Sequence, residues 1–284
     1  MPRADADGWR DAVGTLHRRA AGAVRIVSLV PSLTELVCEL GLAAQLVGRT
    51  GFCVHPRTRL KPVPKVGGTK DVDLAKVRTL APTHVLLNVD ENEKPIAAAL
   101  AQFVPHLVVT HPLDPLDNLA LYRLFGGIFD RTAAAEALCA RFEQAYDALA
   151  QAARAWPRRR VLYLIWKNPW MTVARDTYIA RTLALAGWDT VPANAAERYP
   201  RVQLEQASQD AQFVLLASEP YRFRARDAAE LRALPALHAK AVALVDAEMT
   251  SWYGSRAIAG LDYLRRERER LTAGIACPAA GGQP

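Results

Sequence analysis

The chain has 284 residues, of which 51% are hydrophobic and 23% are charged. This composition is typical of a soluble globular protein with one large domain or two of ordinary size, and it excludes a disordered or fibrous chain. The formal charge is +7. However, the basic runs at 158–160 and 265–270 lack interleaved aromatics, which favours solvated helix faces over a nucleic-acid interface.

Residues 1–23 form a polar, alanine-rich lead, which we expect to be a short helix or a frayed segment. Asp5, Asp7, Asp11 and His17 interrupt every apolar run there, so no secretory signal is predicted. No window reaches the roughly 18 apolar residues of a membrane span, which argues against membrane insertion. The cysteines show neither CxxC nor framework spacing, which favours a reducing compartment. A cytoplasmic protein is therefore expected, if Met1 is the true start.

Residues 24–113 alternate between apolar strand runs and helical patterns, which predicts a first α/β lobe with a parallel sheet. The run from Arg25 to Val30 is the first strand, and a tight turn at Pro31 leads into a helix. Ser32 followed by Glu35 predicts a capping box at the start of this helix. Further strands are expected at 46–49, 83–89 and 106–112, with helices at 74–80 and 96–103.

Residues 114–157 are expected to be helical, and the stretch from Asp130 to Trp156 is the longest uninterrupted helical pattern of the chain. It contains neither Gly nor Pro, and Leu138, Phe142 and Leu149 are among the apolar residues that recur at spacings of three and four. About 25 residues at 1.5 Å each span about 37 Å. We expect this helix to be the spine between two lobes.

Residues 158–272 repeat the strand–helix alternation and predict a second α/β lobe. Strands are expected at 158–166, 171–174, 213–217 and 241–246, and helices at 177–186, 228–234 and 255–271. The tail 273–284 is rich in Gly, Pro and Ala and is predicted to be disordered. The predicted fold is α/β, with two Rossmann-like parallel-sheet lobes joined by a single long backbone helix.

Ligands of parallel α/β sheets lie beyond the carboxyl ends of the strands. Three of the six tryptophans follow predicted strands of the second lobe, and they suggest a broad, partly apolar ligand, or else local core under the loops. The candidate ligand-binding residues at these ends are Ser32, Cys53, His55, Gly68, Thr69, Asp90, Glu91 and Asn92 in the first lobe and Trp166, Trp170, Trp252, Tyr253 and Arg256 in the second.

Cys53 and His55 are the candidate metal ligands, because a thiolate and an imidazole two residues apart can both reach a borderline ion. A third ligand would come from Asp90, from Glu91 or from the bound molecule. The alternative is a buried cysteine beside a histidine bonded to the backbone. The Gly67-Gly68 loop lacks Walker A spacing, but its amides can hold a carboxylate or phosphate. No catalytic motif appears, so no catalytic residue is assigned and the chain is not expected to be an enzyme.

Four stretches occur in the order of a known family: RIVSLVPSLTELVCELGLAAQLVG, KVGGTKDVDLAKVRTLAPTHVLLN, the long central helix, and VLYLIWKNPWMTVARDTYIARTLALAGW. Over residues 24–271 the chain resembles the helical-backbone (class III) substrate-binding proteins, the cobalamin, haem and iron–siderophore receptors of ABC importers. GFCVHP, DENE and SWYGSR resemble a soluble subgroup labelled helical-backbone metal receptors. The resemblance implies two lobes on one rigid helix, with the ligand clamped between them and little hinge closure.

The resemblance also implies residue roles. Trp170 and Trp252 match aromatic contact positions of the cobalamin-type receptors. The loops at Cys53 and Gly68 match two further contact positions, but this chain has other residues there in place of the family's aromatics. In addition, on physical grounds, Ser32 and Thr69 would donate from helix-start loops, and Arg256 would pair with a ligand carboxylate. Importer receptors also carry one exposed Glu on each lobe for docking to the permease. The matching positions fall near Ala75 and Gly254, and neither is acidic, which argues against an ABC permease partner.

The leading hypothesis is a cytoplasmic, non-catalytic binding protein for a metal chelate or corrinoid: cobalamin-like, haem or iron–siderophore. No intrinsic cofactor is expected, and any corrinoid, haem or ferric chelate would be a bound ligand. Two alternatives stay open. One is a periplasmic ABC-transporter substrate-binding protein for cobalamin or an iron chelate with a misassigned start. The other is a chelatase or corrinoid-modifying enzyme that uses His55 and Glu91 as acid and base.

Overall fold

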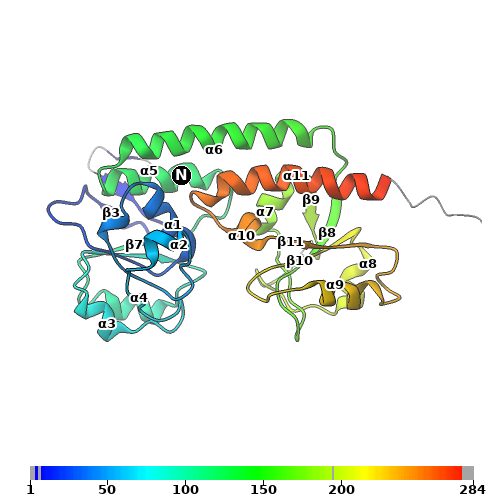
Figure 1. The fold of residues 1–284 in the computed structure, drawn as a ribbon, viewed down its shortest axis with the longest axis horizontal. Helices are drawn as coiled ribbons and strands as arrows, with labels where there is room; N and C mark the ends of the chain where they lie inside the picture. Colours follow the sequence, from blue (N-terminus) through cyan, green and yellow to red (C-terminus); the bar gives the residue numbers. More distant parts are fainter. Residues whose placement is uncertain (1–3, 6–7, 194, 277–284) are drawn as a thin grey trace, which may run out of the picture. The chain divides into compact units, whose positions relative to one another are not determined.

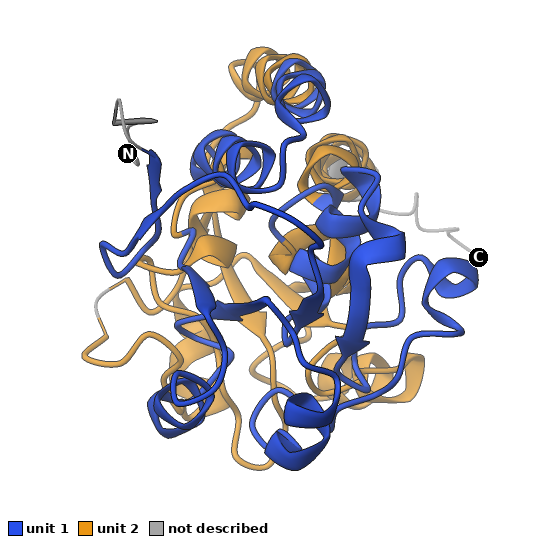
Figure 2. Ribbon diagram, turned by 90° about the vertical axis from the view of Figure 1, so that its left-hand side faces the viewer, with its two compact units in different colours: residues 1–112, 116–142, 253–256 blue, residues 113–115, 143–252, 257–284 orange. Residues whose placement is uncertain are grey.

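The computed structural model describes residues 4–5, 8–193 and 195–276. The chain divides into two compact units. Unit 1 comprises residues 1–112, 116–142 and 253–256, and unit 2 comprises 113–115, 143–252 and 257–284 (Figure 2). Each unit contains a four-stranded sheet in which all strand pairs are parallel. The predicted fold class is confirmed.

The sheet of unit 1 has its two faces covered by different helices (Figure 1). On one face Val27, Val85 and Leu87 pack with residues of α3 and α4 in a single apolar cluster. The strands, in sheet order, are β5 (Leu46–Arg49), β4 (Ile26–Ser28), β6 (His84–Asn88) and β7 (His106–Thr110). The helices are α1 (Pro31–Glu39), α2 (Arg57–Leu60), α3 (Leu74–Thr79), α4 (Lys94–Leu100) and α5 (Asp117–Ile128), with the 3₁₀ turn η1 (Ala43–Gln45).

Helix α1 does not begin with the predicted capping box. Val30 is the N-cap residue and Pro31 occupies the first turn, where its missing N–H costs nothing. The Ser32 side chain is buried and does not cap the helix. The Glu35 carboxylate instead forms an ion pair with Arg256. Proline displaced the helix start by two residues, which removed Ser32 from the capping position.

The N-terminal lead is a small antiparallel sheet rather than a helix or a frayed segment. It consists of β1 (Ala4–Asp5), β2 (Gly8–Arg10) and β3 (Leu16–His17). The buried Asp11 carboxylate accepts from the backbone N–H of Thr15 at 2.9 Å and of Val109 at 3.0 Å, and it contacts His17 Nε2 at 3.1 Å. This carboxylate therefore fastens the lead to β7 within unit 1.

The sheet of unit 2 is also covered on both faces (Figure 1). Its strands, in sheet order, are β11 (Ala241–Val245), β10 (Phe213–Ala217), β8 (Arg159–Leu164) and β9 (Trp188–Thr190). The helices are α7 (Tyr178–Leu185), α8 (Leu204–Gln209), α9 (Ala225–Arg232), α10 (Ala247–Ser251) and α11 (Arg256–Ala276). The strand predicted at 171–174 is wrong, since Met171 makes only isolated bridges to Trp166 and Arg201. The short β9 takes the edge position instead.

The predicted long helix is confirmed as α6 (Thr132–Ala153), with 22 residues. Leu138, Phe142 and Leu149 are buried along one face, as their spacing predicts. The division between the units passes after Phe142, so one continuous helix contributes residues to both. That α6 restricts hinge motion stays a prediction.

Helix α11 extends to Ala276, past the predicted end at residue 271, and residues 277–284 of the predicted tail lie outside the described part. The basic run 265–270 is not wholly a solvated face. Arg268 is 0% exposed, its guanidinium lies 5.9 Å from the Trp156 ring centre and 5.6 Å from that of Trp188, and Nη2 donates to Pro157 O. No helix in the described ranges is long and apolar enough to cross a bilayer.

Candidate functional site

Asn92 fastens the loops at the carboxyl end of the unit 1 sheet. Its side-chain oxygen accepts from Asn88 N at 2.9 Å, and its amide donates to Thr69 O at 2.9 Å. Asn92 is 8% exposed. The residue therefore ties the end of β6 to the Gly68–Thr69 loop, and its polar atoms are committed to the protein.

The acidic residues beside Asn92 also have partners within unit 1. Asp90 Oδ1 lies 3.4 Å from His111 Nε2, and Glu91 Oε1 accepts from the Tyr253 hydroxyl at 2.8 Å. Burial, followed by the Glu91 charge, raises the pKa of Tyr253 well above its usual value, while nearby hydroxyls of Ser32 and Thr110 act in the opposite direction. Tyr253 is thus a neutral hydrogen-bond donor held below the surface.

Cys53 is enclosed by hydroxyl groups. Its side chain is 0% exposed, and Sγ lies 2.9 Å from Thr34 Oγ1 and 3.1 Å from Thr50 Oγ1. Burial raises the pKa of the thiol, which favours the protonated form, whereas a metal ligand must be a thiolate. His55 is half-buried. Within the described ranges, no group of three or more His, Cys, Asp or Glu residues is arranged to hold a metal ion.

The two neighbours of Cys53 are the accessible residues of this loop. Phe52 is 63% exposed and Val54 is 42% exposed. A Cβ atom at Gly68 would lie 2.0 Å from Asp71 Oδ1 and 3.3 Å from Phe52 Cε2, so glycine is needed for this loop packing. Sequence reasoning selected Cys53 and missed Phe52. The usable signal was the alternation in Phe-Cys-Val, which places the small cysteine inside and the larger apolar side chains outside.

Unit 2 carries a group of aromatic rings after β8 and β10. The Trp166 and Tyr221 rings are 5.8 Å apart, and Tyr221 meets Phe223 at 4.7 Å. Trp170 stacks on Phe223, with ring centres 6.2 Å apart and an interplanar angle of 2°, and it packs against the core of this unit. Trp166 is 39% exposed. Trp170 is therefore largely part of the local core, whereas Trp166 is more accessible, and ligand contact by either stays a prediction.

Two further predicted residues are held by carboxylates of the protein itself. Trp252 Nε1 donates to Glu219 Oε1 at 2.6 Å. Arg256 Nε and Nη2 donate to the two oxygens of Glu35 at 2.7 and 2.8 Å. The guanidinium of Arg256 is thus engaged in a bidentate pair within unit 1, which does not fit its predicted pairing with a ligand carboxylate.

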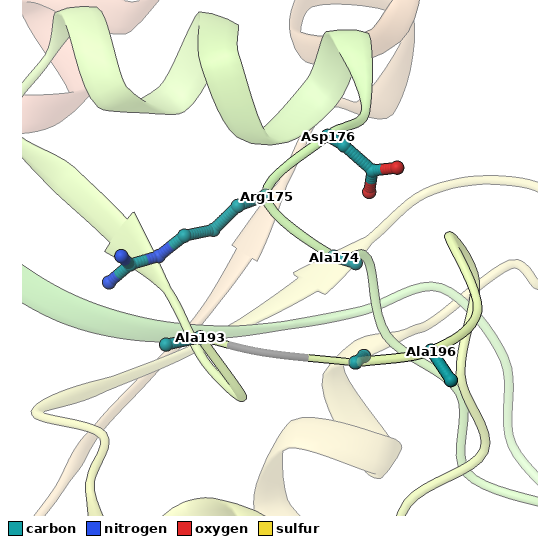
Figure 3. A pocket seen from close by; sticks show the side chains of 6 residues that line it. Ala174, Arg175, Asp176, Ala193 and Ala196 are labelled. Atoms are coloured by element: carbon teal, nitrogen blue, oxygen red, sulfur yellow. The ribbon is translucent and has the colours of Figure 1, made fainter.

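A separate pocket of about 380 Å³ lies in unit 2 (Figure 3). Figure 3 shows the side chains of Arg175 and Asp176 extending in different directions from the same loop. None of its lining residues was predicted as a site residue. They are Ala174, Arg175, Asp176, Ala193, Ala195 and Ala196.

Comparison with known proteins identifies the class of the chain. The family model described as "Periplasmic binding protein" matches residues 26–244. A vitamin B12-binding protein of Vibrio vulnificus (strain YJ016) is 25% identical over 199 residues, covering 66% of this chain and 68% of the relative. A vitamin B12-binding protein of Yersinia pestis (strain Pestoides F) is 24% identical over 201 residues, covering 68% and 69%.

Solved structures of two periplasmic proteins share the fold. The periplasmic vitamin B12 binding protein BtuF of Vibrio cholerae aligns with a TM-score of 0.75 and 19% identity, covering 87% of this chain and 97% of that one. The periplasmic heme-binding protein RhuT of Roseiflexus sp. RS-1 aligns with a TM-score of 0.76 and 20% identity, covering 88% and 99%.

These matches decide between several of the sequence-based hypotheses. The relatives and structural neighbours are substrate-binding proteins, which supports a binding role and gives no support to the chelatase alternative. The expected cytoplasmic location receives no support, whereas the periplasmic alternative agrees with the family. With its family model covering most of the sequence, the chain belongs to the periplasmic binding protein family.

Proposed function

We propose that the chain is a periplasmic substrate-binding protein for a planar metal chelate of the corrinoid or haem kind. Relatives named as vitamin B12-binding proteins support a corrinoid, and the structural likeness to a heme-binding protein supports the wider class of planar chelates. The metal would arrive as part of the ligand rather than as a resident cofactor.

The observation that carries this proposal is where apolar side chains are exposed. Among the described residues, seven large hydrophobic side chains are exposed, and four of them follow the carboxyl ends of β5, β6 and β8. Exposed apolar surface at the ligand-binding end of a parallel sheet is typical of a site for a partly apolar ligand. The four are Phe52, Val54 and Val89 in unit 1 and Trp166 in unit 2.

At the carboxyl end of the unit 1 sheet, accessible polar residues stand beside the exposed apolar ones. Half-buried His55 stands next to exposed Val54 and would approach the metal or a polar edge of the chelate. Asp90, paired with His111, would accept a hydrogen bond from the ligand. We assign Ser32, Cys53 and Asn92 to the support of these loops because all three are buried.

Permease docking through exposed glutamates is not part of this proposal. Gly254 is buried at φ +75°, its N–H donates to Asn118 Oδ1 at 2.6 Å, and its carbonyl accepts from Tyr122. A side chain at this position would meet Ser32 O at 3.3 Å. The position that the resemblance matches to the second docking glutamate of importer receptors therefore lies near an internal turn.

Titration of the purified protein with cyanocobalamin, haemin and ferrichrome tests the proposal. We expect saturable quenching of tryptophan fluorescence and a shifted absorption band with cyanocobalamin or haemin. Metal-free protoporphyrin and ferric chloride serve as controls for the ring alone and the metal alone. Saturable binding of ferrichrome alone would replace the planar-chelate proposal with a siderophore. No saturable change with any of the three would contradict the function.

A further inference from the structure

The backbone that carries Trp252 is fixed independently of the indole ring. The Ser218 hydroxyl accepts from Ala247 N at 2.9 Å, at the start of α10. Near the end of this helix, the hydroxyls of Tyr163 and Thr250 are 2.6 Å apart and both are buried. Trp252 comes directly after α10, so the position of its main chain does not depend on contacts of its side chain.

The direction of the indole ring has an anchor of its own. Trp252 Nε1 donates to Glu219 Oε1 at 2.6 Å, and both residues are half-buried. A tryptophan side chain rotates about two bonds, so a fixed backbone still leaves several ring orientations. A fixed acceptor oxygen at hydrogen-bond distance from the indole N–H favours the orientation that points the N–H toward it. The Glu219 carboxylate thus favours one orientation of the ring.

Glu219 is itself held on both sides in the chain. Ser218 N donates to Val245 O at 3.1 Å, and Tyr221 N donates to Ile165 O at 3.2 Å. The turn that carries Glu219 is therefore fastened to the ends of β11 and β8. It also carries Tyr221, one of the rings beside exposed Trp166. The carboxylate has a fixed place at the edge where we propose that ligand is bound.

We propose that Glu219 is a positioning residue, which orients the Trp252 indole for ligand recognition at the carboxyl end of the unit 2 sheet. The inference rests on the proposed function, but it concerns a residue that acts through Trp252 rather than by touching the ligand. Glu219 is needed as a hydrogen-bond acceptor, and its negative charge is secondary.

A set of four variants tests this by titration with cyanocobalamin and haemin. We expect Glu219→Ala to weaken binding about tenfold, and Glu219→Gln, whose amide oxygen still accepts, to stay within about twofold. In a Trp252→Phe background, Glu219→Ala should cause no further loss, because phenylalanine has nothing to donate. Glu205→Ala removes an exposed carboxylate from the same unit and is the matched control. Unchanged affinity in Glu219→Ala, or an equal loss in the Trp252→Phe background, would overturn the proposal.

A measurement without ligand separates this proposal from the function itself. Acrylamide quenching of tryptophan fluorescence reports how accessible the Trp252 ring is. For each protein, the part due to Trp252 is the difference in quenching with and without Trp252→Phe. We expect Glu219→Ala to increase this part, while Glu219→Gln and Glu205→Ala leave it unchanged. If wild type binds neither probe, the function fails, and unchanged quenching in Glu219→Ala then overturns the positioning role as well. Glu219→Met, which keeps the length without an acceptor, replaces Glu219→Ala if circular dichroism shows that the latter does not fold.

Discussion

The carboxyl ends of the two sheets, each considered within its own unit, carry different kinds of side chain. In unit 1 the polar side chains bind one another and the backbone, and Phe52, Val54 and Val89 are left exposed among them. In unit 2 the aromatic rings pack on one another, and Trp166 is the exposed member. The difference teaches that a polar residue at a sheet end can be scaffold, and that the accessible surface can be apolar.

The largest expected effect concerns Asn92, which the comparison assigns to the scaffold. Asn92→Ala leaves Asn88 N and Thr69 O without their partner, and we expect the free energy of unfolding to fall by about 3 kcal/mol. Urea denaturation measures this loss. The exposed neighbour Glu93 makes no capping hydrogen bond, so Glu93→Ala should change stability by less than about 0.5 kcal/mol. If the two variants lost the same free energy of unfolding, Asn92 would support the loops of unit 1 no more than its exposed neighbour does.

The amino end of the unit 1 sheet provides a second test, by pH. His84 is 4% exposed, its ring stacks on His106 at 4.7 Å, and Thr83 Oγ1 lies 2.8 Å from its Nδ1. Burial, then His106, then His17, lowers the pKa of His84 to about 4. The neutral form is therefore the stable one, and its contribution is present above pH 6.5 and is lost as the pH falls toward 4.

We expect about 2 kcal/mol of stability to be lost between pH 7 and pH 5 in the wild type, and clearly less in His84→Gln. Urea denaturation at both pH values measures the difference. His238 of unit 2 is exposed, and His238→Gln should keep the wild-type pH dependence. If His238→Gln flattened the pH dependence and His84→Gln did not, the acid sensitivity would belong to unit 2.

A third test concerns Arg256. The sequence predicts it as a ligand contact, whereas the structure pairs it with Glu35 within unit 1. The Arg256 side chain is 12% exposed and the Glu35 side chain is 22% exposed. Arg256→Met should lower the free energy of unfolding by about 2 kcal/mol, because it leaves a half-buried carboxylate without its bidentate partner. The double variant Arg256→Met with Glu35→Met should recover part of this loss. If Arg256→Met unfolded like wild type but no longer bound ligand, Arg256 would be a ligand contact rather than a support of unit 1.

The smallest expected effect tests the exposed apolar residues. Phe52→Ala and Trp166→Ala should each weaken chelate binding about fivefold, or roughly 1 kcal/mol. Phe52→Ala should not alter stability by more than about 0.5 kcal/mol, because its side chain is 63% exposed, whereas Trp166→Ala should cost about 1 kcal/mol, because Trp166 is only 39% exposed and its ring contacts that of Tyr221. Isothermal titration calorimetry and urea denaturation measure the two quantities. Val13 is 61% exposed at a hairpin tip, and Val13→Ala should leave binding unchanged. Loss of stability with unchanged affinity in Phe52→Ala would show that its loop is scaffold.

Regular elements with a strong periodic pattern were predictable from the sequence. The helix at 132–153 and the strands β6 and β10 follow directly from runs of good helix formers and of apolar β-formers. The N-terminal sheet was not predictable in this way. Its polar residues carry no apolar pattern, and it depends on the contact of Asp11 with Val109, which is 98 residues away in the chain.

The strand-end loops that carry the candidate site were predictable from the sequence, and the contacts of single residues within those loops were not. The sequence by itself determined two lobes of alternating strands and helices, the long helix and the loops at the strand ends, because periodicity and Pro or Gly signals are local. Only the tertiary structure decided that Cys53 points inward while Phe52 is exposed, and that Glu35 and Glu219 hold Arg256 and Trp252. Such partners are tens to hundreds of residues apart in the chain, and burial is a property of the packed fold rather than of a residue type.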